Sequence, residues 1–276
     1  MINPSLLING SLLQMALVFL LQLSCSLWPF LYLTPITVTG VGFPRLILQI
    51  IGVSYLSAIL ILAYNISLNS FSIFSSLIFI IPIFFWVYVY FRTQESDDER
   101  RSKWLRPLGG WLLFHLVLKL YLGASFVFSP YENGLPWKEF LFTIQSLVLG
   151  GAIYAMCLGH YYLVVPKLSN KFLLKVASLF WVLLAVRAIL LVIWYFYAMP
   201  KDALQIFSLD YFHIMMVLMG IIWGWLGTSV LAIFGQKLTR MNSIQSATGI
   251  YYIVVFFVLT GFLLSNYYFC KYKILF

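Results

Sequence analysis

Eight stretches of this sequence are long and apolar enough to cross a membrane as helices. They are residues 5–33, 45–64, 71–91, 107–128, 140–165, 172–198, 211–235 and 248–269. A spanning helix needs about 20 mostly apolar residues, because each residue adds about 1.5 Å and the hydrocarbon layer is about 30 Å thick. Within lipid a helix satisfies its own backbone polar groups. The sequence therefore predicts an all-α, polytopic integral membrane protein with about eight transmembrane helices.

Composition supports this prediction, because the chain carries too many apolar residues for a soluble domain. Of its 276 residues, 63% are hydrophobic and only 9% are charged, whereas soluble domains carry about 25% charged residues. Lipid must therefore solvate most apolar side chains, which predicts a single transmembrane domain over residues 1–276. The net charge of +9 forms no continuous basic patch, so nucleic acid is not an expected partner.

The basic residues predict how the chain is oriented. They gather in three connections that an eight-span layout places on one side: Arg92, Arg100, Arg101, Lys103 and Arg106, then Lys167, Lys171 and Lys175, then Lys237 and Arg240. The positive-inside rule makes that side cytoplasmic, with both termini outside. Lys271 and Lys273, near the C-terminus, go against this rule, so layouts of seven or nine spans stay open. In a bacterium the membrane would be the plasma or inner membrane.

A short internal similarity suggests that the spans form two halves. "WPFLYLTP" at residues 28–35 ends the first predicted span, and "GHYYLVVP" at residues 159–166 ends the fifth. Two four-helix halves, residues 1–128 and 138–269, would keep the same orientation because four is an even number. The match is short and rich in aromatic residues, so chance explains it equally well.

Ionisable residues inside spans are the first candidates for a functional site, because burying them in lipid costs several kcal/mol. His115 and Lys119 lie four residues apart, on one face of the fourth predicted span, and Arg187 lies at similar depth in the sixth. No Asp or Glu lies at that depth. Either an anion from outside the chain neutralises these cations, such as a lipid phosphate, an acidic cofactor or a neighbouring subunit's carboxylate, or their side chains snorkel to the interface.

The histidines and cysteines show no pattern of metal or haem ligands. His115, His160 and His213 fall at three different depths, whereas two axial ligands of one haem need the same depth. A haem held by this chain alone is therefore disfavoured, and zinc is disfavoured because no three or four ligands converge. His160 beside Tyr161 and Tyr162 is typical of an interfacial helix end. Proton transfer is the alternative for this group.

Residues 236–252 form an unusually polar turn before the last span. This segment contains Arg240 and Gln245, which suit the head group of a lipid or quinone, or a cytoplasmic partner. Capping of the following helix by Asn242 or Ser243 is the alternative interpretation. The candidate binding residues of the chain are thus His115, Lys119, Arg187, His213, His160, Arg240 and Gln245.

No catalytic residue is assigned, because the sequence lacks the GxSxG, HExxH and Walker motifs. We therefore expect a non-catalytic, multi-pass subunit of a larger membrane complex, with respiratory-chain or other electron-transport machinery as the first choice. Quinone or bound phospholipid are the candidate cofactors, and membrane lipids and other membrane subunits are the expected partners. A transporter of a small organic anion is the alternative, followed by a lipid-modifying enzyme.

One resemblance to a known family concerns layout only. Eight spans with both termini outside are similar to the quinol-oxidising membrane anchors of DMSO-reductase-like enzymes. The similarity rests on topology and on no residue motif, so it assigns a role to no residue of this chain.

Overall fold

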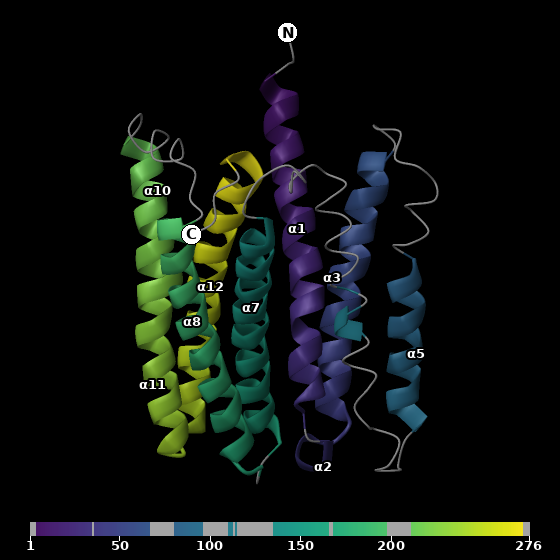
Figure 1. The fold of residues 1–276 in the computed structure, drawn as a ribbon. Helices are drawn as coiled ribbons and strands as arrows, with labels where there is room; N and C mark the ends of the chain where they lie inside the picture. The colour runs from purple at the N-terminus through teal and green to yellow at the C-terminus, as the bar shows by residue number, and fades with distance from the viewer. Residues whose placement is uncertain are drawn as a thin grey trace. The chain divides into compact units, whose positions relative to one another are not determined.

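The computed structural model describes residues 4–34, 36–66, 80–95, 110–112, 114, 135–165, 168–197 and 211–272. All regular structure in these residues is helical (Figure 1). A first unit, Met1–Phe126, contains α1 (Pro4–Tyr32), α2 (Ile36–Thr39), α3 (Gly42–Ile66) and α5 (Ile81–Glu95). A second unit, Val127–Phe276, contains α7 (Leu135–Val164), α8 (Lys171–Tyr197), α10 (Tyr211–Ile221), the π-helical turn η1 (Ile222–Gly227), α11 (Thr228–Arg240) and α12 (Ile244–Tyr272).

Six helices in the described residues are long and apolar enough to cross a membrane. They cover Met15–Tyr32, Gly42–Ile61, Phe140–Val164, Lys171–Ile193, Tyr211–Arg240 and Ile244–Phe269. They agree with six of the eight predicted spans and confirm a polytopic helical membrane protein. Of the predicted span 71–91, the structure describes the apolar helix Ile81–Phe91. Of the span 107–128 it describes only residues 110–112 and 114, which are helical.

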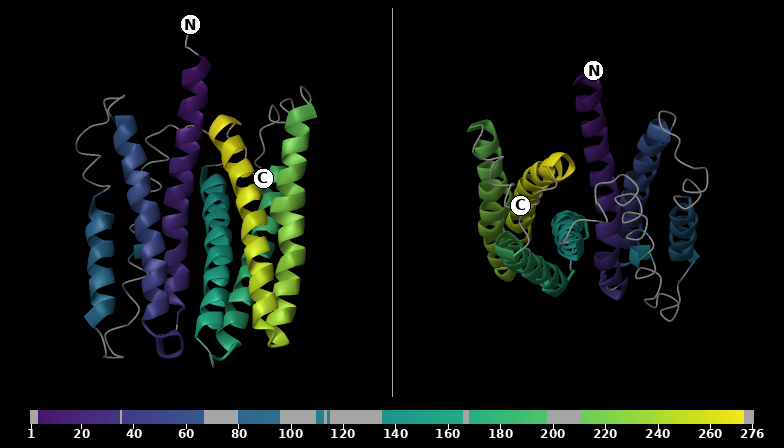
Figure 2. Two further views of the ribbon diagram at one scale, coloured as in Figure 1. Left: turned by 180° about the vertical axis from the view of Figure 1, so that it is seen from behind. Right: turned by 45° about the horizontal axis from the view of Figure 1, so that its top comes forward.

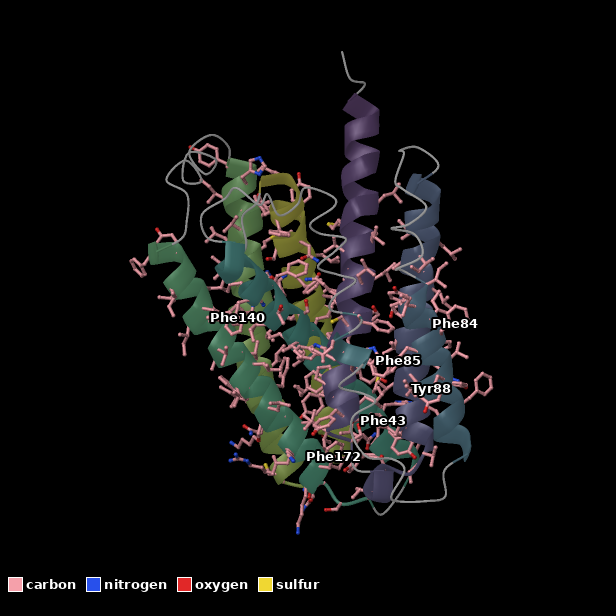
Figure 3. The ribbon with its side chains drawn as sticks, turned by 45° about the vertical axis from the view of Figure 1, so that its right-hand side comes forward. Phe43, Phe84, Phe85, Tyr88, Phe140 and Phe172 are labelled. Carbon is pink, nitrogen blue, oxygen red and sulfur yellow. The ribbon has the colours of Figure 1, made fainter. Side chains whose placement is uncertain are left out.

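Aromatic side chains pack the core of the first unit. Trp28 of α1 is fully buried, with its ring centroid 5.9 Å from that of Phe85 and 5.4 Å from that of Phe114. Figure 3 shows Phe85 on α5, whereas Phe84 and Tyr88 of the same helix are exposed. Sequence position near a span end is typical of a residue in the interfacial aromatic belt, but Trp28 is a core residue.

An indole hydrogen bond joins α3 and α5 within this unit. The Trp86 Nε1–H donates to the Leu48 carbonyl oxygen at 2.7 Å. The indole lies so close to α3 that a Cβ on Gly52 would come within 2.3 Å of it. Glycine at position 52 is therefore what lets the two helices approach, as small residues do at many membrane helix interfaces.

In the second unit, the long helices run side by side, as both views in Figure 2 show. Helix α7 packs against α8 and α12, and α11 packs against α8 and α12. The predicted span 211–235 corresponds to the span Tyr211–Arg240 of the structure, whose middle is the π-helical turn η1. At this turn a Cβ on Gly224 would lie 2.4 Å from the Gly261 Cα of α12. The two backbones are thus in direct contact, which only glycine permits.

Candidate functional site

A cluster of polar side chains lies buried between α7 and α12. Gln145 of α7 and Ser265 and Asn266 of α12 are each no more than 3% exposed. The Ser265 hydroxyl donates to Gln145 Oε1 at 3.3 Å, and Gln145 Nε2 donates to Asn266 Oδ1 at 3.5 Å. Buried amides are costly unless their hydrogen bonds are made, and these bonds are long. The cluster is therefore a buried polar contact that joins α7 and α12 within their spans.

Arg187 of α8 is the buried cation of the same unit. It is 5% exposed, so protein covers its side chain. A side chain that extends along a lipid-facing surface toward the interface would be more exposed. Arg187 lies about 24 Å from the start of α8, and Gln145 lies about 29 Å from the adjoining end of α7. Since α7 and α8 pack as neighbours, the two residues lie within about one helical turn of the same height.

The four spans of the second unit supply no acidic residue near this arginine. Residues 140–201 and 211–276 contain no Asp or Glu. The nearest acidic residues in the sequence are Glu139, Asp202 and Asp210. Their side chains are not among those that the structure describes. A guanidinium group offers five donors and a fixed charge. Such a group can bind carbonyl, phosphate or carboxylate oxygens.

His213 of α10 pairs with Tyr268 of α12. The Tyr268 hydroxyl lies 2.8 Å from His213 Nδ1 and donates to the His213 carbonyl oxygen at 3.3 Å. When the phenol proton goes to the carbonyl oxygen, Nδ1 carries the proton that it gives to the phenol oxygen, and the lone pair lies on Nε2. When the phenol proton instead goes to Nδ1, the other tautomer is present, so this contact fixes the position of the imidazole but not its tautomer.

His160 lies far from His213 along the spans. It is exposed near the end of α7, and its Nδ1 lies 3.2 Å from the hydroxyl of Tyr252. Tyr252 and Tyr268 are 16 residues apart on α12, or about 24 Å along its axis. His160 and His213 are thus too far apart to be axial ligands of one haem. The described residues contain no group of three His, Cys, Asp or Glu side chains placed to hold a metal ion.

The polar turn after α11 has a clear structural role. Ser243 N–H donates to the Leu238 carbonyl at 3.0 Å and Asn242 N–H to the Thr239 carbonyl at 3.2 Å. With Asn242 at φ 59°, this is the Schellman pattern that ends many helices. Asn170 Nδ2 donates to the Asn242 side-chain oxygen at 2.5 Å, which ties the turn to the start of α8.

The two predicted site residues of this turn lie at its surface. Arg240 ends α11 and Gln245 is the second residue of α12, and both are exposed. Ser243 precedes α12, and its carbonyl accepts the Ala247 N–H at 2.9 Å. The only hydrogen bond shown for its hydroxyl, among the described residues, goes to Ser246 Oγ at 3.1 Å.

The structure separates the predicted site residues into groups. Arg187 is buried in the membrane, His213 lies toward one end of the second unit, and His160, Arg240 and Gln245 lie at the other. His115 and Lys119 are outside the described residues. Sequence reasoning missed Gln145, Ser265 and Asn266, although polar side chains inside predicted spans were a visible signal for them.

No protein family, curated protein or solved structure matches this chain. The second unit holds a buried cation, Arg187 of α8, and a separate buried polar cluster of Gln145, Ser265 and Asn266 between α7 and α12.

Proposed function

We propose that this chain is an integral subunit of a larger membrane complex, in respiratory or other redox machinery, that binds a quinone or a phospholipid. The observation that carries the proposal is Arg187, buried in a span at nearly the height of the Gln145 amide. A quinone offers two carbonyl acceptors and a phospholipid offers phosphate oxygens. Either ligand would accept hydrogen bonds from guanidinium and amide donors in a medium where no water competes.

The layout of the chain supports a subunit that binds and positions a ligand, while other subunits catalyse the redox reaction. The connections of the second unit that the structure describes are short: α8 follows α7 after residues 165–170, and α12 follows α11 after residues 241–243. Such turns leave no room for a soluble catalytic domain at this end of the unit. Partner subunits would supply the redox centres.

One observation favours the alternative, a transporter of a small organic anion. The π-helical turn η1 interrupts a span in its middle, and Gly224 there contacts Gly261. Interrupted helices at mid-membrane are typical of transporters, in which the irregular backbone lines the substrate site. In that case Arg187 would bind the carboxylate of the substrate in transit.

The proposal includes the complete topology. Residues 71–91 and 107–128 would add two spans to the six described, both termini would face outward, and the spans would form two four-helix halves. The quinone and lipid candidates do not depend on this count, because the residues of the polar site all lie in the second unit.

Isolation from native membranes tests the proposed function. The chain, extracted in mild detergent, should co-migrate with other polypeptides and retain quinone or phospholipid. Arg187→Met should lose this ligand, because removing one side of a buried charged interaction costs about 3–5 kcal/mol. The exposed Lys237→Met, which makes the same change of charge, should retain it. A stable monomer that moves an organic anion into liposomes would instead establish the transporter.

A further inference from the structure

A second anion-binding surface lies at the other end of the second unit, where α8 begins and α11 ends. Asn170, just before α8, donates from Nδ2 to the Thr239 carbonyl oxygen at 3.0 Å, which places these two helix ends together. Side-chain nitrogens gather at this end, near the labelled Phe172 (Figure 3). Lys171 and Lys175 of α8 and Arg240 of α11 are all exposed here. We call these three residues the basic seam.

A hydrogen bond sets the register of the two helices at the seam. Gln236 Nε2 of α11 donates to the Ser178 hydroxyl of α8 at 2.8 Å. Residues three, four and seven apart share a helix face. Lys171 and Lys175 therefore lie on the face of α8 that carries Ser178, and Arg240 lies on the face of α11 that carries Gln236. Both faces adjoin the contact between α8 and α11.

The two nearest cations of the seam lie at almost the same height. Lys175 is three residues before Ser178 on α8, and Arg240 is four residues after Gln236 on α11. Because the two helices are antiparallel, both cations lie toward the same end of the unit. These offsets are about 4.5 and 6 Å. Thr239, beside Arg240, turns inward, with its hydroxyl 3.0 Å from that of Tyr251 on α12. Lys175 and Arg240 thus share the outer side of the α8–α11 pair.

Helix stability does not account for these lysines. Lys171 and Lys175 lie in the first two turns of α8, where the helix dipole disfavours positive charge. The spans and connections over residues 140–201 and 211–276 contain no acid to neutralise them. Like charges at one height repel each other, and an anion bound between them would relieve this repulsion.

The surface changes from basic to apolar about two helical turns from Lys175 and Arg240, closer to the middle of the membrane. Val182, four residues after Ser178, is 56% exposed, and Ile233, three residues before Gln236, is 50% exposed. The two residues continue the same outer side of the pair. A cationic end followed by an exposed apolar strip matches the phosphate and acyl chain of a phospholipid. It does not match a free phosphate ion, which has no apolar part.

We propose that the basic seam binds the head group of an anionic phospholipid, with the acyl chain along Val182 and Ile233. Basic pockets between membrane helices are known to hold such head groups. This site is separate from the buried site at Arg187, so it stands whether or not that site binds quinone. The seam gives Arg240, one of the sequence-predicted binding residues, a ligand of defined chemistry.

Native mass spectrometry of the full chain in neutral detergent, with added phosphatidylglycerol, tests the proposal. Lys175→Gln with Arg240→Gln should weaken binding about 25-fold, since each of the two cations near a head group contributes a factor of about five. The control pair Lys271→Gln with Lys273→Gln, which removes the same charge near the C-terminus, should change binding by less than about threefold. The exchange Lys175→Arg with Arg240→Lys should keep it.

Several results would overturn the proposal. Equal losses in the two glutamine pairs would show only a general attraction of a basic protein for anionic lipid. Tighter lipid binding after Asp97→Asn with Asp98→Asn would show that the chain's own acidic segment occupies the seam. A measurement without variants gives a separate check. Phosphatidylglycerol should raise the Tm of the unaltered chain, and an equal rise with phosphatidylcholine or inorganic phosphate would contradict the proposal.

Discussion

The contact between Gly224 and Gly261 predicts a large and specific effect of one methyl group. In Gly261→Ala, the new Cβ would lie 2.3 Å from the Gly224 Cα, whereas ordinary contacts begin at 3.4 Å. The nearest atom is backbone, so no side chain can rotate away and α12 must move by about 1 Å from the π-helical turn. Overpacking of this kind costs about 1–3 kcal/mol. We therefore expect Gly261→Ala to lower the free energy of unfolding by this amount.

Gly249 gives a matched control on the same helix. A Cβ at this position meets nothing within 4 Å, so Gly249→Ala should be neutral or should stabilise α12 by up to about 1 kcal/mol through helix propensity. The assay is unfolding of the purified chain by heat or by sodium dodecyl sulfate in mixed micelles, followed by circular dichroism. If the two alanine variants unfold together, the close backbone contact is not present in the protein.

Three further predictions test other parts of the account. Tyr251→Phe should lower the free energy of unfolding by about 1 kcal/mol, because it removes the buried hydroxyl contact with Thr239; unfolding in the same micelles measures it, and no change would show that the contact contributes nothing. Trp86→Phe should cost at least as much, because it removes the indole bond to the Leu48 carbonyl, and a variant as stable as the parent would refute that bond. Single cysteines should be labelled from outside at position 133 and protected at position 102, because the positive-inside rule makes the loop 92–106 cytoplasmic; the reverse pattern would invert the orientation.

The spans were predictable because lipid imposes a simple rule on length and polarity. The six spans of the structure match six predicted stretches closely, since about 20 apolar residues in a row have few alternatives to a helix. The burial of Arg187 is less predictable, because sequence gives depth in the membrane but not the face of the helix. Its side chain could have extended toward the interface, and the structure instead shows it covered by protein.

Contacts between helices could not be predicted from one sequence. Gln145 and Asn266 are 121 residues apart, and nothing in either span indicates that they meet. Trp28 is an aromatic residue near a span end, as interfacial residues are, yet it is buried because Phe85 and Phe114 pack around it. The π-helical turn Ile222–Gly227 is likewise hidden, since a run of apolar residues and glycines is compatible with a regular helix.

Photo-crosslinking with a quinone analogue tests the central claim most directly. The probe would be added to native membranes that contain the complex, and the labelled peptides would be identified by mass spectrometry. The account predicts labels around Arg187 on α8 and around Asn266 on α12, reduced by excess unmodified quinone and absent in Arg187→Met. Labels confined to the exposed surface of α10, such as Met215 and Leu218, and unaffected by competing quinone would contradict it.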